Sequence, residues 1–461
     1  MKVKHLFISS SDSRTASAIR HLLSALLAVA LMLLMLSRVM FVLNDEAYYT
    51  KMEDFYRYPT EYDVWFMGSS HVIMGTVPEE LWNSYGIRPY NLAEYGQSFP
   101  LDYWFIKNLS RLGTPKLIVL DVLQIDKDYL YSGSNLGSLR SSMMALPWSR
   151  DKIDMINTLF EGDLKEEMIF PFATRHNNWR QVKEEYFVTV PYYELGGDLN
   201  HFRGNPTKDM VCPASIPASL PLDDYKTDEN NGFLYFREII RFCKENDIEV
   251  LVVKSPCQAA EKDLRWYNGA FRVAQEENVP YIDGFSIPGL VNGETDMWDE
   301  THLNASGARK WTDYLGNYIS AHYPELCAPE MDEKQKTRWN ERYNDYLLFY
   351  DEKTATQLSL YNYLMQASHP KYTVAVQIKE GSSLYQDGTV MALLNNIGDF
   401  RGLADAAAQG TAYSGVAGSE SGVALLPFEA DGEILITLYD ESMEKIDQAC
   451  FDASRARVQD A

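Results

Sequence analysis

Between residues 62 and 325 the sequence alternates short apolar runs with longer amphipathic stretches, and this alternation constrains the fold more than any other feature. The apolar runs are rich in β-branched and aromatic side chains, as expected of strands buried on both faces. Strands that alternate with helices form a parallel sheet covered on both sides, which predicts a three-layer α/β/α domain. The expected strands are VWFM (64–67), YNLA (90–93), LIVLDV (117–122), VLVVK (250–254) and PYID (280–283), and the expected helices are Leu101–Leu112, Phe233–Asn246, Asp263–Glu277 and Ala305–Tyr323.

One connection of this flavodoxin-like domain is far too long for a simple crossover. The insertion, residues 123–232, is rich in Tyr, Asn, Trp and Pro and shows only patchy periodicity. Insertions of this size at the edge of a sheet often form lids or substrate walls. The alternative is a structural excursion that packs elsewhere, and the sequence leaves both open.

The N-terminal region carries the features of a membrane anchor. The run Leu23–Leu43 is 21 residues long and is interrupted only by Arg38, so as a helix it would span the hydrocarbon core of about 30 Å. A cleaved signal peptide is the alternative, but its apolar region is usually shorter and ends at a small-x-small site. We therefore expect an uncleaved anchor at residues 22–43. The charges on either side of this anchor place residues 1–21 in the cytoplasm and the remainder outside. The basic residues before the anchor are Lys2, Lys4, Arg14 and Arg20, and the acidic residues after it are Asp45 and Glu46.

Composition excludes two classes of protein. Hydrophobic residues make up 46% of the 461-residue chain, which argues against a disordered protein. The formal net charge of -23, without a basic patch, argues against nucleic acid as a partner. No metal or cofactor is expected, because the cysteines lack metal-ligand spacing, although one disulfide remains possible. The five cysteines are Cys212, Cys243, Cys257, Cys327 and Cys450.

The pattern changes after residue 327. Residues 328–367 are charged, contain aromatic side chains and read as a helical linker. Residues 368–457 contain short apolar runs separated by Gly and Ser turns, which predicts a small, separate, mostly β domain. The expected strands are YTVAVQI, GTVMALL, TAYSGVAG, SGVALLPF and EILITLYD, and one helical piece is expected near Phe400–Gln409.

Two stretches bring potential catalytic groups to the carboxyl edge of the predicted sheet. The first strand runs into Gly68, Ser69, Ser70 and His71, and Asp299 and His302 lie three residues apart just before the last helix, which Asn304 or Ser306 can cap. A nucleophilic serine needs a base, and the base needs a partner that fixes its tautomer. The alternatives are an ordinary Gly-Ser turn and a capping acid beside a surface histidine. Because both stretches lie at the same edge, we expect Ser70, His302 and Asp299 to form a triad.

This order of motifs resembles the SGNH/GDSL hydrolase superfamily over residues 60–325, within an expected domain of 44–327. The resemblance implies that Ser70 is the nucleophile, that Gly96 contributes to the oxyanion hole, and that Asp299 and His302 complete the triad. WFMGSSH, YNLAEYGQS, PKLIVLDV, RHNNW and DETHLNASGARKW together look like membrane-anchored envelope proteins related to the D-alanyl transfer protein of teichoic acid modification and to polysaccharide O-acetylation proteins. That likeness implies an envelope glycan or glycopolymer as substrate and a membrane-bound O-acyltransferase as partner.

The chain departs from the superfamily at its third block, glycine-x-asparagine-aspartate. The segment VLDVLQID offers Asp121 and Gln124 instead, so the backbone amides of Ser70 and Gly96 are the expected oxyanion donors, with Gln124 as a candidate. His71 and His176 are expected to line the pocket, the latter because related envelope proteins carry a histidine-tryptophan motif there. The C-terminal segment resembles the interleukin-like EMT inducer domain, which is associated with glycan binding.

These observations predict a single-pass membrane protein with its catalytic domain outside the cell, most consistent with an O-acyltransferase of an envelope glycan. Two other functions stay open. One is an esterase or lipase of the same fold that uses water as acceptor. The other is a non-catalytic envelope scaffold, which the missing third block favours.

Overall fold

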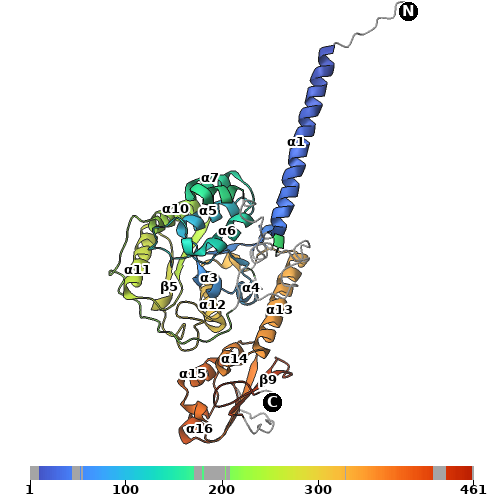
Figure 1. Cartoon of the computed structure of the whole chain (residues 1–461). Coiled ribbons are helices and arrows are strands. Elements are labelled where there is room, and N and C mark those ends of the chain that lie inside the picture. Colours follow the sequence, from blue (N-terminus) through green and yellow to red (C-terminus); the bar gives the residue numbers. More distant parts are fainter. Residues whose placement is uncertain are drawn as a thin grey trace, which may run out of the picture.

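The computed structural model describes residues 10–43, 52, 55–170, 179–180, 203, 208–327, 329–418 and 432–458. Helix α1 (Ser10–Leu43) projects from one end of a domain with a parallel sheet, and the C-terminal part lies at the opposite end (Figure 1). The chain therefore has three successive parts, and the parallel-sheet domain is the central one.

The central sheet contains five parallel strands in the order β2-β1-β3-β4-β5. This is the flavodoxin-like order, and it confirms the parallel sheet expected from the alternating pattern. All carboxyl ends point to one edge, so that loops following different strands meet there. The strands are β1 (Val64–Met67), β2 (Pro89–Asn91), β3 (Leu117–Asp121), β4 (Glu249–Lys254) and β5 (Tyr281–Asp283).

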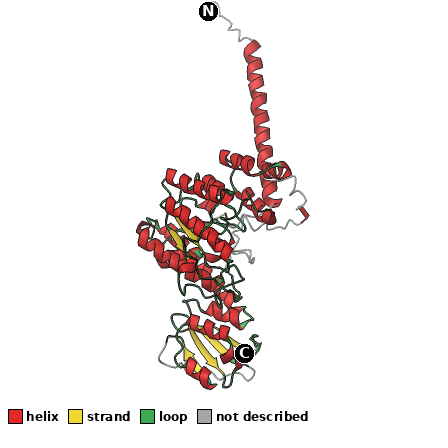
Figure 2. Ribbon diagram, turned by 90° about the vertical axis from the view of Figure 1, so that its left-hand side faces the viewer, coloured by secondary structure: helices red, strands yellow, loops and turns green. Residues whose placement is uncertain are grey.

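Helices cover both faces of this sheet (Figure 2). Along β1, Val64 and Phe66 face one core, whereas Trp65 and Met67 face the other, because successive side chains of a strand point to opposite sides. The first core is closed by α3 (Ser70–Gly75), α4 (Pro78–Tyr85) and α12 (Ala305–His322), and the second by α5 (Phe99–Leu109), α10 (Asn231–Glu245) and α11 (Glu261–Glu276). The three-layer arrangement follows from the two-residue period of the strands.

The described parts of the long insertion differ in structure and in where they pack. Its first part forms a helical excursion in which α7 packs on α5 and on α8. Its last part, from residue 208, runs along the carboxyl edge of the sheet, where Cys212 N donates to Met297 O at 2.9 Å. The first part is therefore a structural excursion, and the last part lies at the sheet edge, where its role as a lid or substrate wall stays a prediction. The helices of the excursion are η1 (Gly133–Asn135), α6 (Leu136–Ala145), α7 (Arg150–Leu159) and α8 (Gly162–Ile169).

Among the described residues, one helix is long and apolar enough to cross a membrane. Its apolar span covers Thr15–Leu36, which begins a few residues before the expected anchor, and none of that span is buried within the protein. Leu43, the last residue of α1, is buried against the rest of the protein. The helix therefore reaches the central domain with only a short length of chain outside the apolar span.

The C-terminal part is built on a four-stranded antiparallel sheet in the order β7-β6-β8-β9. The strand expected at GTVMALL is wrong, because these residues form helix α15 (Gly388–Ile397). Asp387 caps that helix by accepting from the amides of Thr389 and Val390, both at 3.1 Å. The helix expected near 400–409 is confirmed as α16 (Leu403–Gln409), and SGVALLPF lies outside the described residues. The strands are β6 (Thr373–Ile378), β7 (Tyr413–Val416), β8 (Ile434–Tyr439) and β9 (Lys445–Phe451), with the 3-10 turn η7 (Ser383–Gln386) between β6 and α15.

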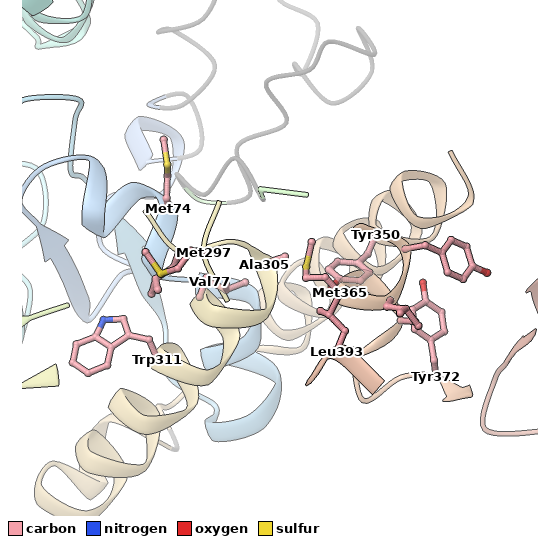
Figure 3. Packing of buried hydrophobic residues seen from close by; sticks show 14 of the residues in the cluster. Met74, Val77, Met297, Ala305, Trp311, Tyr350, Met365, Tyr372 and Leu393 are labelled. Carbon is pink, nitrogen blue, oxygen red and sulfur yellow. The ribbon is translucent and has the colours of Figure 1, made fainter. Parts of the chain in front are cut away.

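The C-terminal part shares a hydrophobic core with the central domain. Figure 3 shows Met74 and Trp311 of the central domain in the same cluster as Met365 and Leu393. The expected linker is helical, as α13 (Glu333–Ala355) and α14 (Leu360–Ala367), and α14 packs on both α12 and α15. The boundary expected at residue 368 therefore lies within a continuous packed region. All five cysteines are free.

Candidate active site

The loop after β1 is shaped by Gly68. Its φ of +138° is one that residues with a Cβ rarely adopt, and a Cβ there would lie 3.0 Å from Val72 Cγ2 and 3.2 Å from Asp121 Cβ. The chain can therefore turn sharply between the buried strand and α3. Ser69 precedes α3 and is buried, whereas Ser70, the first residue of α3, remains partly accessible. The turn thus exposes only the second of the two hydroxyls.

The loop before α12 is held by Asn304. Its Oδ1 accepts from the amides of Ser306 and Gly307 at 3.1 Å each, and its Nδ2 donates to Thr295 O at 2.8 Å. The side chain thus caps the helix and ties the preceding loop across its base. Because the loop is fixed at both ends, the side chains that it carries have little positional freedom.

The structure brings Ser70, His302 and Asp299 together. His302 Nε2 lies 2.8 Å from Ser70 Oγ, and His302 Nδ1 lies 2.8 Å from Asp299 Oδ2. Asp299 Oδ1 also accepts from the backbone amides of His302 at 2.8 Å and Thr301 at 2.7 Å. Burial acts to raise the pKa of Asp299, but the hydrogen bonds from His302 and Thr301 outweigh it and lower that pKa. The carboxylate therefore stays ionised beside the imidazole and can orient its Nδ1–H toward itself.

Gly96 lies on the loop that follows β2, in a left-handed conformation with φ of +66°. This loop runs alongside the turn after β1, because Leu92 N donates to Phe66 O at 2.9 Å and Glu94 N donates to Gly68 O at 3.2 Å. The loop of the predicted oxyanion glycine and the loop of the predicted nucleophile are thus hydrogen-bonded neighbours at the carboxyl edge.

Gln124 is engaged elsewhere. Its Oε1 accepts from the Tyr129 hydroxyl at 2.7 Å, and no hydrogen bond described in the structure joins it to Ser70, His302 or Asp299. Asp121 is also occupied, since its Oδ2 accepts from Ser255 N and Ser255 Oγ at 3.0 and 2.9 Å. These contacts therefore place neither Asp121 nor Gln124 as an oxyanion donor. His176 lies outside the described residues.

His71 lies directly behind the candidate base. Its ring packs edge-on against the ring of His302, with centroids 5.3 Å apart, and its side chain is buried. Lys254 at the end of β4 is fully buried, and its Nζ lies 3.3 Å from His71 Nδ1 and 2.6 Å from Ser255 O. Burial, the Lys254 charge and His302 together lower the pKa of His71 well below 6.5. A neutral His71 therefore accepts through Nδ1 from the ammonium group.

Two buried carboxyl groups lie beneath the same loops and were missed by sequence reasoning. Burial raises the pKa of Asp102 to about 8, although its carboxyl accepts from Gln97 Nε2 at 2.6 Å and from the amide of Gly68. Burial also raises the pKa of Glu94 to about 8. Asp102 lies in the apolar sequence FPLDYW, so the only sequence signal was an isolated acid on a buried helix face.

A groove of about 1010 Å³ begins beside the triad loop. Glu300, which lies between Asp299 and Thr301 in the chain, belongs to its lining, and Gln258 N donates to Glu300 O at 3.1 Å. One wall is the last part of the insertion, residues 213–218, and another is the segment 284–294 after β5. Asn396 of α15 also belongs to the lining, so the C-terminal part contributes to the same groove.

Comparisons with known proteins give little beyond this geometry. No family model matches the chain, and no curated protein matches it. Among solved structures, the chain is similar to one described as "a putative acylhydrolase" from Bacteroides fragilis, with 13% identity over 60% of this chain and 99% of that one. The TM-score of that match is 0.29, so it carries no argument about this site.

Proposed function

We propose that this chain is a membrane-anchored, extracytoplasmic enzyme of acyl esters, with Ser70 as nucleophile, His302 as general base and Asp299 as the residue that orients the base. The observation that carries the proposal is the continuous hydrogen-bonded chain from Ser70 Oγ through His302 to Asp299. The sequence resemblance to the SGNH/GDSL superfamily supports the same assignment.

The proposed reaction has two steps that conserve atoms and protons. Ser70 Oγ attacks the carbonyl carbon of the ester while His302 Nε2 takes its proton, and the leaving alcohol then receives that proton as the acyl-enzyme forms. An incoming hydroxyl next attacks the acyl-enzyme and gives its proton to His302, which passes a proton to Ser70 Oγ as the bond between the acyl carbon and that oxygen breaks. Asp299 stays ionised throughout and stabilises the imidazolium. The amides of Ser70 and Gly96 are the proposed donors to the oxyanion.

We propose a glycan or glycopolymer of the cell envelope as the substrate. The groove beside the triad supports this, because it is open at the surface and its lining combines uncharged hydrogen-bonding and charged groups with apolar ones. Such a lining suits a chain of sugars better than an acyl tail, which needs a deep apolar cavity. The polar side chains of the lining are Ser215, Gln258, Asn292, Glu294, Glu300, Lys310 and Asn396.

Transfer to a glycan hydroxyl is our proposal for the second step, with hydrolysis as the alternative. A membrane anchor holds the site near acyl donors delivered through the membrane, such as those supplied by a membrane-bound O-acyltransferase, and a hydrolase needs no such donor. The test is to form an acyl-enzyme at Ser70 and to let water and a glycan acceptor compete for it. Acylated glycan supports transfer, whereas free acid as the sole product supports hydrolysis.

The roles within the triad predict a rank order of variants. Ser70→Ala and His302→Ala should each lower the rate by about 10⁶-fold, because the two groups act as a unit. Asp299→Ala should lower it by about 10⁴-fold, since Ser70 and His302 remain in contact. Equal losses in all three variants would argue that Asp299 takes part directly in proton transfer. Full activity in any of them would contradict the triad, whereas no activity in the folded wild-type chain would favour the scaffold alternative.

The proposed topology has its own test. If α1 spans the membrane with its N-terminus in the cytoplasm, an alkaline phosphatase fusion at residue 60 is active, and the mature chain keeps its N-terminus. An inactive fusion would reverse the orientation. Recovery of a soluble, N-terminally trimmed chain would show that α1 is a cleaved signal sequence.

A further inference from the structure

The helical excursion of the insertion exposes large apolar side chains where a water-soluble surface would carry polar ones. Trp148, Ile153, Ile169, Phe170 and Trp179 are 48% to 62% exposed, and we call them the excursion patch. On α7 the buried face is formed by Lys152, Met155, Ile156 and Leu159, so Ile153 lies on the solvent side of the helix. Single exposed apolar residues are common, but four lie between residues 148 and 170, and Trp179 follows in a short described stretch of the same insertion, which indicates a contact surface.

The excursion lies at the end of the central domain from which α1 leaves (Figure 1). The apolar span of α1 ends at Leu36 and Leu43 is already buried against the protein, so about 10 Å of helix separates the span from the domain. The headgroup region on each side of a bilayer is about 5 to 8 Å thick. A membrane that holds α1 therefore places its headgroups at the level of this end of the domain.

The residue types of the excursion patch suit a bilayer surface. Tryptophan concentrates at the interface between hydrocarbon and water, and long cationic side chains accompany it there. Lys152 Nζ lies 4.7 Å from the centre of the Trp148 ring, and the Arg180 guanidinium lies 5.5 Å from the centre of the Trp179 ring. Lys152 is itself buried on α7, and burial lowers its pKa to about 7, so of these two pairs it is that of Arg180 and Trp179 that presents an exposed cation.

We propose that the excursion patch inserts into the outer headgroup layer of the membrane that α1 spans, and so forms a second, non-covalent attachment of the catalytic domain. This inference rests on the membrane-spanning role proposed for α1, and not on the chemistry at Ser70. The attachment is apolar rather than electrostatic, because residues 136–170 contain six acidic and only four basic side chains. It should therefore persist in neutral phosphatidylcholine and at high salt.

Tryptophan fluorescence tests the proposal directly, because residues 1–43 contain none of the nine tryptophans of the chain. The full chain is reconstituted in phosphatidylcholine vesicles with or without acyl chains brominated near the headgroup, and flotation verifies insertion. We expect bromine to quench the wild-type protein. The variant W148F/W179F should lose most of this quenching, and each single variant should lose part of it. W266F, which removes a half-buried tryptophan of α11, should keep the quenching.

Three results would overturn the proposal. A wild-type chain that floats with the vesicles but is not quenched does not touch the lipid, and the excursion patch would then be a surface for a protein partner. Quenching that is unchanged in W148F/W179F would come from another part of the molecule. Failure to float would remove the role of α1 on which the inference rests. None of these readouts depends on catalytic activity, so a failure of the proposed chemistry would leave them unchanged.

Discussion

The ammonium group of Lys254 lies 3.3 Å from Nδ1 of His71, and both side chains are buried directly behind the candidate base His302. A positive charge at this place opposes protonation of His71. The contact joins the end of β4 to the start of α3, so it also fixes the position of α3 relative to the sheet. The pair supports the active site from below without contacting Ser70 through any hydrogen bond that the structure describes.

Stability below neutral pH should depend on His71. The folded chain holds this imidazole neutral, whereas the unfolded chain protonates it below about pH 6.5, so the unfolded state binds more protons and the free energy of unfolding falls as the pH drops. In His71→Gln this contribution is absent. The difference between wild type and variant should change by up to about 1.4 kcal/mol per pH unit below 6.5 in urea unfolding. The exposed His322→Gln serves as control, and equal pH dependence in wild type and His71→Gln would refute the buried neutral state.

Asp102 should give the free energy of unfolding the opposite pH dependence, so that stability falls as the pH rises. Its pKa is raised to about 8 in the folded chain, so between about pH 4 and pH 8 the folded state keeps a proton that the unfolded state releases. The stabilisation is complete below pH 4 and is lost as the pH rises toward 8. Asp102→Asn keeps a neutral side chain at every pH and should gain stability relative to wild type from pH 5 to pH 8. Urea unfolding at both pH values measures this, with the exposed Asp163→Asn as control. A difference that stays constant with pH would contradict the raised pKa.

Gly68→Ala should damage the site more than the fold. The new Cβ would meet Val72 Cγ2 at 3.0 Å, and the φ of +138° would be strained, at a cost of about 1 to 3 kcal/mol in unfolding free energy. Relief of this strain moves the turn that carries Ser70, so we expect a loss of at least about 10²-fold in acylation rate. Gly133→Ala is the matched control, because a Cβ there has nothing within 4 Å. An unchanged acylation rate in Gly68→Ala would show that the turn does not position the nucleophile.

The C-terminal part should need α14 in order to fold alone. A fragment that begins at residue 368 lacks Leu360, Tyr363 and Leu364, which are fully buried in the shared core. It also lacks the bridge between Ser359 and Ala456. Thermal unfolding of residues 332–458 should be cooperative, and that of residues 368–458 should not. Cooperative unfolding of the shorter fragment would restore the boundary predicted from the sequence.

The sequence predicted those parts of the fold that follow from the hydrophobic period of each segment and from the order of the segments along the chain. Buried strands and amphipathic helices differ in period, and the carboxyl ends of parallel strands share an edge, so the meeting of Ser70 and His302 could be expected across 232 positions. GTVMALL was assigned wrongly because a short β-branched apolar run does not distinguish a strand from one buried helix face. The capping signal that decides it, Asp387 two residues before Thr389, was present in the sequence.

Other features of the site depend on contacts that no local pattern encodes. Lys254 reads as the polar end of a strand, and its burial follows from side chains brought in by α3, α11 and the turn after β5: His71, Tyr267 and Phe285. Gln124 occupies the place of the superfamily's third block, yet its side-chain oxygen accepts a hydrogen bond from the hydroxyl of Tyr129, five residues later. In both cases the partner is selected by tertiary packing, so the residue type alone could not predict the role.

The most direct test of the central claim is the mass of the intact protein after treatment with a fluorophosphonate probe. We predict one adduct, mapped to Ser70 by peptide sequencing, which is absent in Ser70→Ala and forms several orders of magnitude more slowly in His302→Ala. Ser69→Ala should label like wild type, because the Ser69 hydroxyl is buried and has no hydrogen-bond partner among the described residues. Labelling at Ser69, or no labelling of a folded wild-type protein, would contradict a nucleophilic Ser70.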